Sequence, residues 1–243
     1  MAIYNSDFIF GIVSIVIKLI SKLLLILIIY SFIDNIAGWG LNQLLFLYSF
    51  STTSYAVWHC FFINTITIPT YIRNGTLDVL LLRPIGSVFQ IMMDGFDEDG
   101  WGELFFGIVL SIVAIVRLKI FSPFLLLLPL LWCFGSLIFA GISLILASFA
   151  FFTKGYSDFT DITMELQDFG KYPTNIYGKY LSIFLTFLMP LGFTAFYPSL
   201  FYIESSMNHM LLVFATPVVC ILFFGLSCLF WKFSLRFYSS AGN

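Results

Sequence analysis

Residues 120–153 read IFSPFLLLLPLLWCFGSLIFAGISLILASFAFFT, and this run contains no Asp, Glu, Lys or Arg. A helix of about 20 apolar residues crosses the hydrocarbon core of a bilayer, so the run is long enough for a membrane span. Three further uncharged runs, 35–72, 180–203 and 205–231, are also long enough. Of all 243 residues, 60% are hydrophobic and only 10% are charged, whereas soluble domains carry about a quarter charged residues. The sequence therefore predicts an integral membrane protein.

Two weaker apolar stretches complete the expected set of spans. Residues 8–33 are apolar except for Lys18 and Lys22, which share one helix face and either turn toward a bundle interior or snorkel. Residues 101–121 cross fully if the basic residues at their C-terminal end snorkel. We therefore expect an all-α polytopic membrane protein with six transmembrane helices in a single domain, residues 1–243. The expected spans are 8–33, 41–66, 101–121, 124–152, 177–197 and 210–231, and the expected cytoplasmic loops are 67–100 and 153–176.

The basic residues support this topology with both termini in the cytoplasm. Six spans place seven Lys and Arg residues inside and only Arg117 and Lys119 outside. The inside set is Arg73, Arg83, Lys154, Lys171, Lys179, Lys232 and Arg236. If residues 101–121 did not cross, four basic residues would face five, which violates the positive-inside tendency.

The stretch between the last two expected spans contains Pro190 and Pro198 among apolar residues, and it is longer than a simple turn. Irregular backbone at membrane depth is tolerated where protein surrounds it. We therefore expect a broken, partly re-entrant outer segment over residues 190–209.

The composition excludes several functional classes. The net charge is −2 and the 11 Lys and Arg residues are scattered, so no surface for nucleic acid is expected. The four cysteines lie singly in apolar runs, without the spacing of a metal site or a disulfide framework. No segment between spans could fold as a catalytic domain, and no Walker A loop is present. We expect no catalytic residue, metal site or cofactor on this chain.

The first expected cytoplasmic loop contains a short apolar helix between two helix-breaking residues. Gly75 breaks the descending helix, and Pro84 disfavours helix at Arg83. The roughly two turns between them carry four leucines beside Asp78. This is more apolar surface than a solvated linker needs, and it indicates either an interfacial membrane helix or a docking site for a soluble partner.

A second short helix is expected directly after this one. Ser87 and Gln90 have the spacing of a capping box, which predicts a helix running toward Asp94. The acidic residues that follow, Asp94, Asp97, Glu98 and Asp99, lack the spacing of an EF-hand. They predict a solvated turn before the third span.

The run Gly75-Thr76-Leu77-Asp78-Val79-Leu80-Leu81-Leu82-Arg83-Pro84 resembles the G-x-L-D-x-L-L-x-R-P signature of ABC-2 type exporter permeases, in particular their small six-span membrane subunits. Further matches in the same order are Asp7-Phe8, Gly38-Trp39, Asp97 through Glu103, Phe169 through Pro173, and Arg236 through Gly242. The resemblance covers essentially the whole chain.

The resemblance implies an ABC-2 exporter-type bundle and a transporter whose membrane part and ATP-binding part are separate chains. In that family the loop between spans two and three forms a coupling helix that seats in a cleft of the ATP-binding subunit. Here the docking residues would be Gly75, Leu77, Asp78, Leu82, Arg83 and Pro84. The implied partners are two copies of an ABC ATP-binding subunit, which would carry ATP and Mg, and a second permease chain, identical or homologous. The implied location is the bacterial cytoplasmic membrane.

The second expected loop contains another short amphipathic stretch. Ile162, Leu166 and Phe169 repeat at helical spacing, with acidic residues elsewhere on the surface. An acidic face is repelled by an anionic leaflet, and the resemblance implies a second contact with the ATPase. The candidate residues for this contact are Ile162, Glu165, Leu166 and Phe169.

Polar residues within or near the first two spans are candidates for a translocation path or for helix packing, because polar groups at membrane depth normally face protein. They are Lys18, Lys22, His59 and Asn64.

The expected function is the membrane subunit of an ATP-driven exporter. One alternative is a scaffold or sensor subunit that uses the same ATPase contact. A second alternative is a secondary transporter, which would need a coupling-ion site at the midplane. The sequence places acidic residues only near the ends of the expected spans, which counts against this alternative.

Overall fold

The fold comes from a computed structural model that describes residues 2–155, 159, 161–204 and 207–239. Within these residues the chain forms helices, turns and one isolated bridge between Ile36 and Trp39. The α-helices are α1 (Ala2–Phe32), α2 (Leu41–Phe62), α3 (Ile68–Arg73), α4 (Leu77–Leu81), α5 (Ser87–Met92), α6 (Glu98–Leu118), α7 (Leu128–Ser148), α8 (Asp161–Gly170), α9 (Lys179–Ile183), α10 (Phe196–Glu204) and α11 (Met207–Ser234). Short 3-10 turns extend α2 (Ile63–Thr67) and flank α7 (Pro123–Leu127 and Phe149–Phe151).

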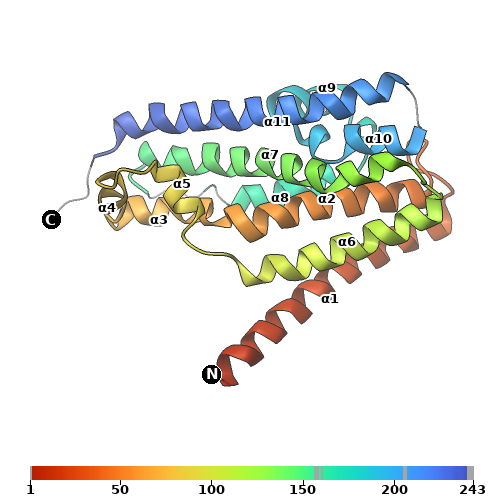
Figure 1. Ribbon diagram of the computed structural model, residues 1–243, viewed down its shortest axis with the longest axis horizontal. Coiled ribbons are helices and arrows are strands. Elements are labelled where there is room, and N and C mark those ends of the chain that lie inside the picture. The colour runs from red at the N-terminus through yellow and green to blue at the C-terminus, as the bar shows by residue number, and fades with distance from the viewer. Residues whose placement is uncertain (1, 156–158, 160, 205–206, 240–243) are drawn as a thin grey trace.

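The long helices α2, α6, α7 and α11 run along the long axis of the molecule, and α1 crosses this direction obliquely, with its N-terminal end away from the other helices (Figure 1). The short helices α3, α4 and α5 gather at one end, which we call the α4 end, and the turn between α6 and α7 lies at the opposite end, which we call the far end. Helix α11 ends at the α4 end, and α1 runs from that side toward the far end.

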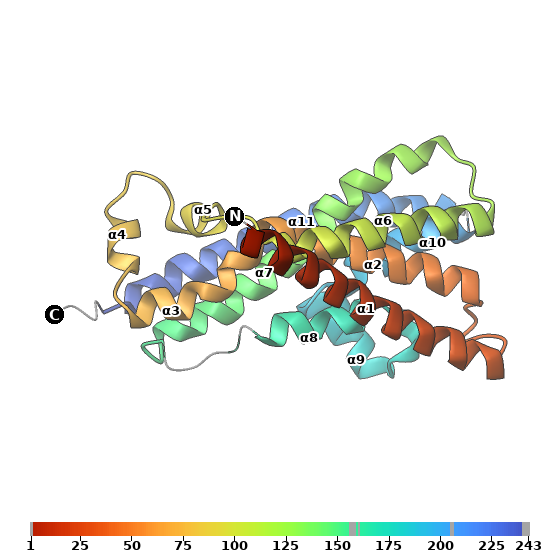
Figure 2. The same ribbon diagram turned by 90° about the horizontal axis from the view of Figure 1, so that it is seen from below.

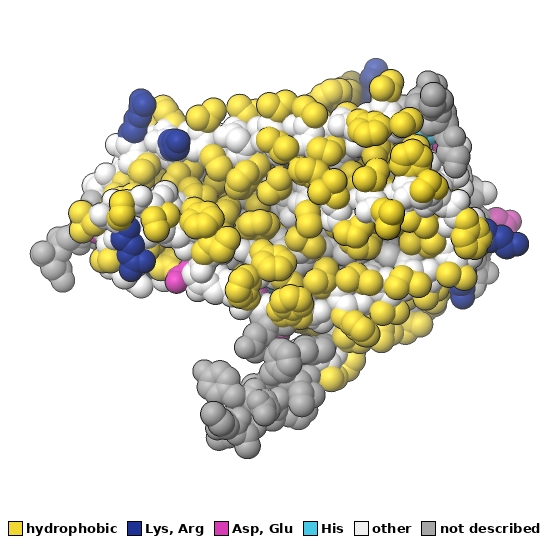
Figure 3. Space-filling model, in the orientation of Figure 1, with side chains coloured by type: hydrophobic (Ala, Val, Ile, Leu, Met, Phe, Trp, Pro, Cys, Tyr) yellow, Lys and Arg dark blue, Asp and Glu magenta, His cyan; other side chains and the backbone are white. Residues whose placement is uncertain are grey.

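The flank of this bundle is apolar. In Figure 3, hydrophobic side chains cover the visible face between the ends, and Lys and Arg side chains gather toward the two ends. Four of the described helical stretches are long and apolar enough to cross a membrane, namely Val13–Phe32, Asp99–Leu118, Pro123–Phe151 and His209–Phe237. They correspond to four of the six expected spans, and the chain is a helical multi-pass membrane protein.

The expected span 41–66 is helical but is not among these four, because the middle of α2 is polar. Its serines and threonines between Ser49 and Ser54 are nevertheless buried, since α2 packs against both α6 and α7. Gly107 of α6 lies directly against Thr53, and Gly135 of α7 lies directly against Ser54. Small side chains allow helices in a membrane to approach closely, so α2 is the central helix of the bundle.

The expected fifth span, 177–197, is not one continuous helix. This stretch is broken into α9, a π-helical turn (Phe184–Leu188) and a 3-10 turn (Leu191–Thr194). The passage from the α4 end to the far end is made instead by residues 161–176, within the expected cytoplasmic loop 153–176. Figure 2 shows α8 beside α1 along one edge of the bundle, and Asn175 donates a hydrogen bond to the carbonyl of Ala37 at the far end.

Helix α8 fits inside the bundle because its buried face is small and polar. Thr163 and Gln167 are buried, and the Cα of Gly170 lies so close to Ser51 in the middle of α2 that a Cβ would meet its hydroxyl at 2.9 Å. A search for apolar runs misses such a helix, because protein rather than lipid surrounds this face.

Residues 179–204 form a helical hairpin that enters and leaves the bundle at the far end. Leu188 and Met189 lie beside Leu146, near the end of α7 toward α4. Helix α10 then returns, and the Tyr202 hydroxyl donates to the carbonyl of Phe124 at the far end. The break expected between the last two spans therefore begins earlier than residue 190, and its re-entry into the membrane stays a prediction.

The new path of the chain redistributes the 11 basic residues. Five lie at the α4 end (Arg73, Arg83, Lys154, Lys232 and Arg236), three lie toward the far end (Arg117, Lys119 and Lys179), and three lie between the two ends (Lys18, Lys22 and Lys171). Lys171 and Lys179 therefore leave the expected cytoplasmic set. The α4 end keeps its excess of basic residues, which still favours the cytoplasmic side for this end.

Candidate functional site

Helices α4 and α5 form a small folded unit at the α4 end. Gly75 makes the turn before α4 with a φ of 71°, a conformation that favours glycine. Leu77 is fully buried in a cluster that includes Ile72 and Trp231. The amide of Gln90 donates to the carbonyls of Leu80 and Ile85, at 2.9 and 2.6 Å, and so fastens α5 to α4.

The capping box expected at Ser87 and Gln90 is wrong. The residue that caps α5 is Gly86, without a side-chain hydrogen bond. Ser87 Oγ instead accepts a hydrogen bond from Trp231 Nε1 of α11 at 3.3 Å, and Gln90 faces α4. Both side chains therefore join helices to one another, which a local sequence motif does not reveal.

A set of apolar side chains stands exposed on this unit, and we call it the α4–α5 patch. Its members are Val79, Leu82, Ile85, Phe89 and Met93, each at least 54% exposed and Leu82 86% exposed. Arg83 and Pro84 are also exposed, whereas Leu77 is buried and cannot contact a partner. Asp78 lies near Tyr238, and burial together with this carboxylate raises the pKa of Tyr238 to about 12.

A cavity of about 480 Å³ lies among α1, α2, α8 and the start of α6, and we call it the inner cavity. Its apolar and aromatic wall consists of Ile15, Tyr55, Ile63, Ile66 and Met164, and its polar wall of Lys18, Lys22, His59, Asp97, Asp99, Glu103, Glu165, Gln167 and Asp168. The sequence-predicted residues Lys18, Lys22 and His59 therefore come together. Asn64 does not line the inner cavity, and its amide donates to the carbonyl of Gly95 at 2.9 Å.

One end of the inner cavity is closed by a three-residue ionic network. Lys22 Nζ of α1 lies 2.9 Å from both carboxylate oxygens of Asp168 in α8. The same carboxylate accepts a hydrogen bond from Lys171 Nζ at 2.8 Å. The Lys171 side chain is only 2% exposed, and its ammonium lies 5.6 Å from the centre of the Tyr48 ring. This network holds α8 against α1 and α2.

A second polar group lies nearer the α4 end. His59 Nδ1 of α2 is 3.0 Å from Glu103 Oε2 of α6, and His59 Nε2 is 3.7 Å from Asp97 Oδ2. Asp97 also caps α6, because its side chain accepts a hydrogen bond from the backbone N–H of Asp99. The solvated acidic turn expected here is confirmed for Asp94 and Asp99, which are exposed, whereas Asp97 is half-buried; Asp97 and Asp99 also line the inner cavity.

The expected second docking stretch lies in α8. Leu166 and Phe169 pack against a buried cluster that includes Tyr55 and Ile142, and Glu165 lines the inner cavity. Ile162 is 38% exposed. Leu166 and Phe169 therefore contact neighbouring helices of this chain, and a contact of this stretch with an ATP-binding subunit stays a prediction.

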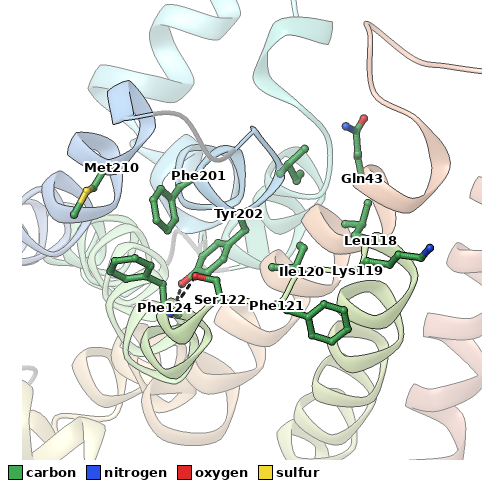
Figure 4. Close-up of a pocket in the computed structure, with 11 residues that line it drawn as sticks. Gln43, Leu118, Lys119, Ile120, Phe121, Ser122, Phe124, Phe201, Tyr202 and Met210 are labelled. Atoms are coloured by element: carbon green, nitrogen blue, oxygen red, sulfur yellow. Dashed lines mark hydrogen bonds between the residues drawn. The ribbon is translucent and has the colours of Figure 1, made fainter.

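A further pocket of about 520 Å³ lies at the far end, and we call it the outer pocket. It is lined by the turn between α6 and α7 and by α10, with Phe121, Phe124 and Tyr202 around it (Figure 4). Lys119 is the only charged residue in its lining.

Sequence reasoning missed Glu103, Asp168 and Lys171 as parts of the bundle interior. One signal was available, because Lys18 and Lys22 in an apolar span need a counter-charge. The partner of Lys22 lies 146 residues away, and no local pattern identifies it. Within the described part of the chain, no group of three or more His, Cys, Asp or Glu residues could hold a metal ion.

Comparison with known proteins places these features in a family. A family model described as "ABC-2 family transporter protein" matches residues 16–242. No curated protein and no solved structure gives a significant match.

Proposed function

The chain belongs to the ABC-2 family of transporter membrane proteins, and from this premise we propose that it is the permease subunit of an ATP-driven exporter. It would dock a separate ATP-binding subunit through α4 and α5 and form half of a translocation path with a second permease chain, identical or homologous. Two copies of the ATP-binding subunit would supply ATP and Mg, and the α4 end would face the cytoplasm.

The observation that carries this proposal is the exposure of the α4–α5 patch at the α4 end. Five large apolar side chains there are each more than half exposed. Contiguous exposed apolar surface marks an interaction site. The packing beneath it is rigid, because Leu77 is buried and Gln90 ties α4 to α5. A rigid apolar protrusion suits a cleft in a soluble partner.

The length of the central helix favours a soluble partner over an interfacial position in lipid. Residues 41–73 run through α2, a 3-10 turn (Ile63–Thr67) and α3, with a non-helical φ of −127° at Phe62. Laid end to end, these segments correspond to about 50 Å at about 1.5 Å per residue. A hydrocarbon core is about 30 Å thick, so the end of α3 would stand roughly 20 Å beyond it. Interfacial helices bury their apolar face only about 5–10 Å into the headgroup boundary. The α4–α5 patch would lie beyond their reach.

The same construction gives the docked partner a mechanical connection to the bundle. Leu77 of α4 and Ile91 of α5 pack in one buried cluster with Ile72 of α3, Leu144 of α7 and Trp231 of α11. A displacement of α4 by closure of the ATP-binding subunits would therefore be passed to α3 and to the two long helices α7 and α11 at once. This is the expected route from ATP hydrolysis to movement of the permease.

The two alternative functions, a scaffold or sensor subunit and a secondary transporter, are not equally supported. A scaffold or sensor subunit would use the same patch and differs only in moving no substrate. The argument against a secondary transporter, that acidic residues lie only near span ends, still applies, because Glu103 lies in the second turn of α6 and Asp168 belongs to α8, which is not among the four candidate spans. Family membership still favours an ATP-driven permease.

The test compares two equally exposed leucines at opposite ends. Leu82 in the α4–α5 patch and Leu126 at the far end are both 86% exposed. We expect Leu82→Ser to weaken assembly with a candidate ABC ATP-binding subunit from the same genome by roughly ten- to a hundredfold, since burial of a leucine contributes about 1.5–3 kcal/mol. Leu126→Ser should leave assembly unchanged. The affinity would be measured with both purified proteins in lipid nanodiscs.

A normal affinity in Leu82→Ser would refute docking through the α4–α5 patch. Transport would then be followed in vesicles containing the assembled complex. An assembled complex that hydrolyses ATP but moves none of a broad substrate panel would support the scaffold alternative.

A further inference from the structure

The inner cavity combines apolar walls with an excess of negative charge. Its lining contains five carboxylates and two lysines, which gives a net charge of −3 with His59 neutral and −2 with His59 protonated. Ile15, Ile63, Ile66 and Met164 supply apolar surface, and Tyr55 supplies an aromatic ring. Its volume of about 480 Å³ lies in the range of about 300–1,000 Å³ that is typical of small-molecule sites.

The charges are not evenly distributed along the inner cavity. At one end Asp168 is shared by Lys22 and Lys171, so that end carries no spare negative charge. The acidic excess lies nearer the α4 end, where Asp97 and Glu103 share the single imidazole of His59. Glu165 forms no ion pair with any residue that the structure describes. A cation would therefore be attracted to the end of the inner cavity nearer α4.

A buried amide in the wall points independently to a ligand. Gln167 of α8 lines the inner cavity and is only 6% exposed. No described residue forms a hydrogen bond with its side chain. The amide atoms of Gln167 are not among the fully enclosed polar atoms without a partner, so they remain accessible from the inner cavity. A ligand in the inner cavity, or the water that the ligand carries, would satisfy the Gln167 amide.

We propose that the inner cavity is the cytoplasmic substrate site of this permease and that it binds amphipathic organic cations, with the cationic group near Glu165 and Asp99 and the apolar groups against Ile63, Ile66 and Met164. This inference rests on the proposed export function and names its substrate class. An aromatic ring such as that of Tyr55 also attracts cations through its π face. The outer pocket, whose lining carries the single charge of Lys119, would repel a cation that reached it and so favour release.

The experiment uses two ions of the same shape and opposite charge. Tetraphenylphosphonium and tetraphenylborate would be titrated onto the full chain in lipid nanodiscs, with empty nanodiscs subtracted. We expect saturable binding of the phosphonium and at least tenfold weaker binding of the borate. This measurement needs no ATP-binding subunit, so its failure is separate from failure of docking through Leu82.

Variants locate the binding in the inner cavity. Asp99→Asn and Glu165→Gln should each weaken phosphonium binding by roughly three- to tenfold, because each removes one partly screened charge. Asp161→Asn is the matched control, since Asp161 is exposed at the start of α8 and does not line the inner cavity. Size-exclusion elution and the affinity for the ATP-binding subunit would show that each variant is folded.

Equal affinity for the two ions would overturn the proposal, and so would normal phosphonium affinity in both cavity variants. If that occurs while Leu82→Ser still weakens assembly, the substrate class is wrong and the permease function stands. If phosphonium binds as expected but Leu82→Ser has no effect, the cation site stands and docking through the α4–α5 patch is wrong.

Discussion

The α4–α5 patch and the inner cavity are opposite exceptions to the rule that apolar side chains are buried in protein or lipid and charged side chains are exposed to water. At the α4 end, which carries five of the 11 basic residues, large apolar side chains such as Leu82 stand exposed. Inside the apolar bundle, charged side chains such as Lys22, Lys171 and Asp168 lie together. Each arrangement is unfavourable in its own surroundings unless something covers or pairs the residues.

The difference between the two regions lies in where the compensation comes from. Lys22 and the buried Lys171 are paired with Asp168 of the same chain, at 2.8–2.9 Å. The α4–α5 patch has no such cover among the described residues, although the packing beneath it is tight. The comparison therefore assigns a mainly structural role to the network at one end of the inner cavity and an intermolecular role to the α4–α5 patch.

The sharpest test of this comparison is to remove the shared carboxylate. Asp168→Asn would leave Lys22 and Lys171 close together without a counter-charge. Loss of one partner of a buried ion pair costs about 3–5 kcal/mol. Because the Asp168 side chain is 47% exposed, we expect a smaller loss of roughly 2–4 kcal/mol. The midpoint of thermal denaturation in detergent should fall by roughly 5–15 °C.

Two further variants separate charge from packing in this test. Asp161→Asn makes the same chemical change at the exposed start of α8 and should shift the midpoint little. Lys171→Met combined with Asp168→Asn should recover part of the loss, because it removes one of the two unpaired cations. An unchanged midpoint in Asp168→Asn would show that the network does not hold α8 in the bundle.

The α4–α5 unit could be predicted from the sequence more fully than the inner cavity. The α4–α5 unit lies within about 20 consecutive residues, and its helix breakers Gly75 and Pro84 are local signals. The long apolar runs likewise predicted α1, α7 and α11. The inner cavity depends instead on α8, which a count of apolar residues assigns to a loop because Asp168 and Lys171 are charged. Each charge is unfavourable alone and acceptable as a pair, and the pairing exists only in the folded chain.

The dependence on the folded chain also explains why residues 177–197 were expected to form one continuous span, although they are broken into shorter segments. Residues 180–203 have the composition of a span, but the chain reverses near Pro190 and follows α10 back to the far end. Composition predicts that a segment prefers an apolar environment, and it does not tell whether the segment crosses or turns back. Helix α2 shows the opposite case. Its middle is polar, yet it lies at the centre of the bundle, because other helices surround it.

A second prediction tests whether close helix packing shapes the inner cavity without involving the α4–α5 patch. A Cβ on Gly100 of α6 would lie 2.7 Å from the backbone nitrogen and 2.9 Å from Sγ of Cys60 in α2. Gly100→Ala should therefore push α6 away from α2, disturb the pairing of His59 with Glu103, and cost about 1–3 kcal/mol. The midpoint of thermal denaturation should fall, while the affinity for the ATP-binding subunit should stay unchanged.

Gly225→Ala is the matched control for this substitution. A Cβ on Gly225 of α11 meets no other atom within 4 Å, and alanine favours helix over glycine. We expect its midpoint to stay the same or rise slightly. If Gly100→Ala behaved in the same way, the close contact of α2 with α6 would not be needed for the inner cavity.

The smallest predicted effect concerns the one lysine of the inner cavity that has no ion-pair partner among the described residues, Lys18. Unlike Lys22, it opposes the acidic excess without stabilising a helix contact. Lys18→Gln should make the lining more negative by one charge and tighten tetraphenylphosphonium binding by roughly two- to threefold, because Lys18 is exposed and its charge is well screened. Thermal stability should not change. Lys119→Gln, in the outer pocket, is the matched control and should leave the affinity as it is. A weaker affinity in Lys18→Gln would mean that this lysine helps to hold the ligand, and the charge balance of the inner cavity would then not determine which ion it binds.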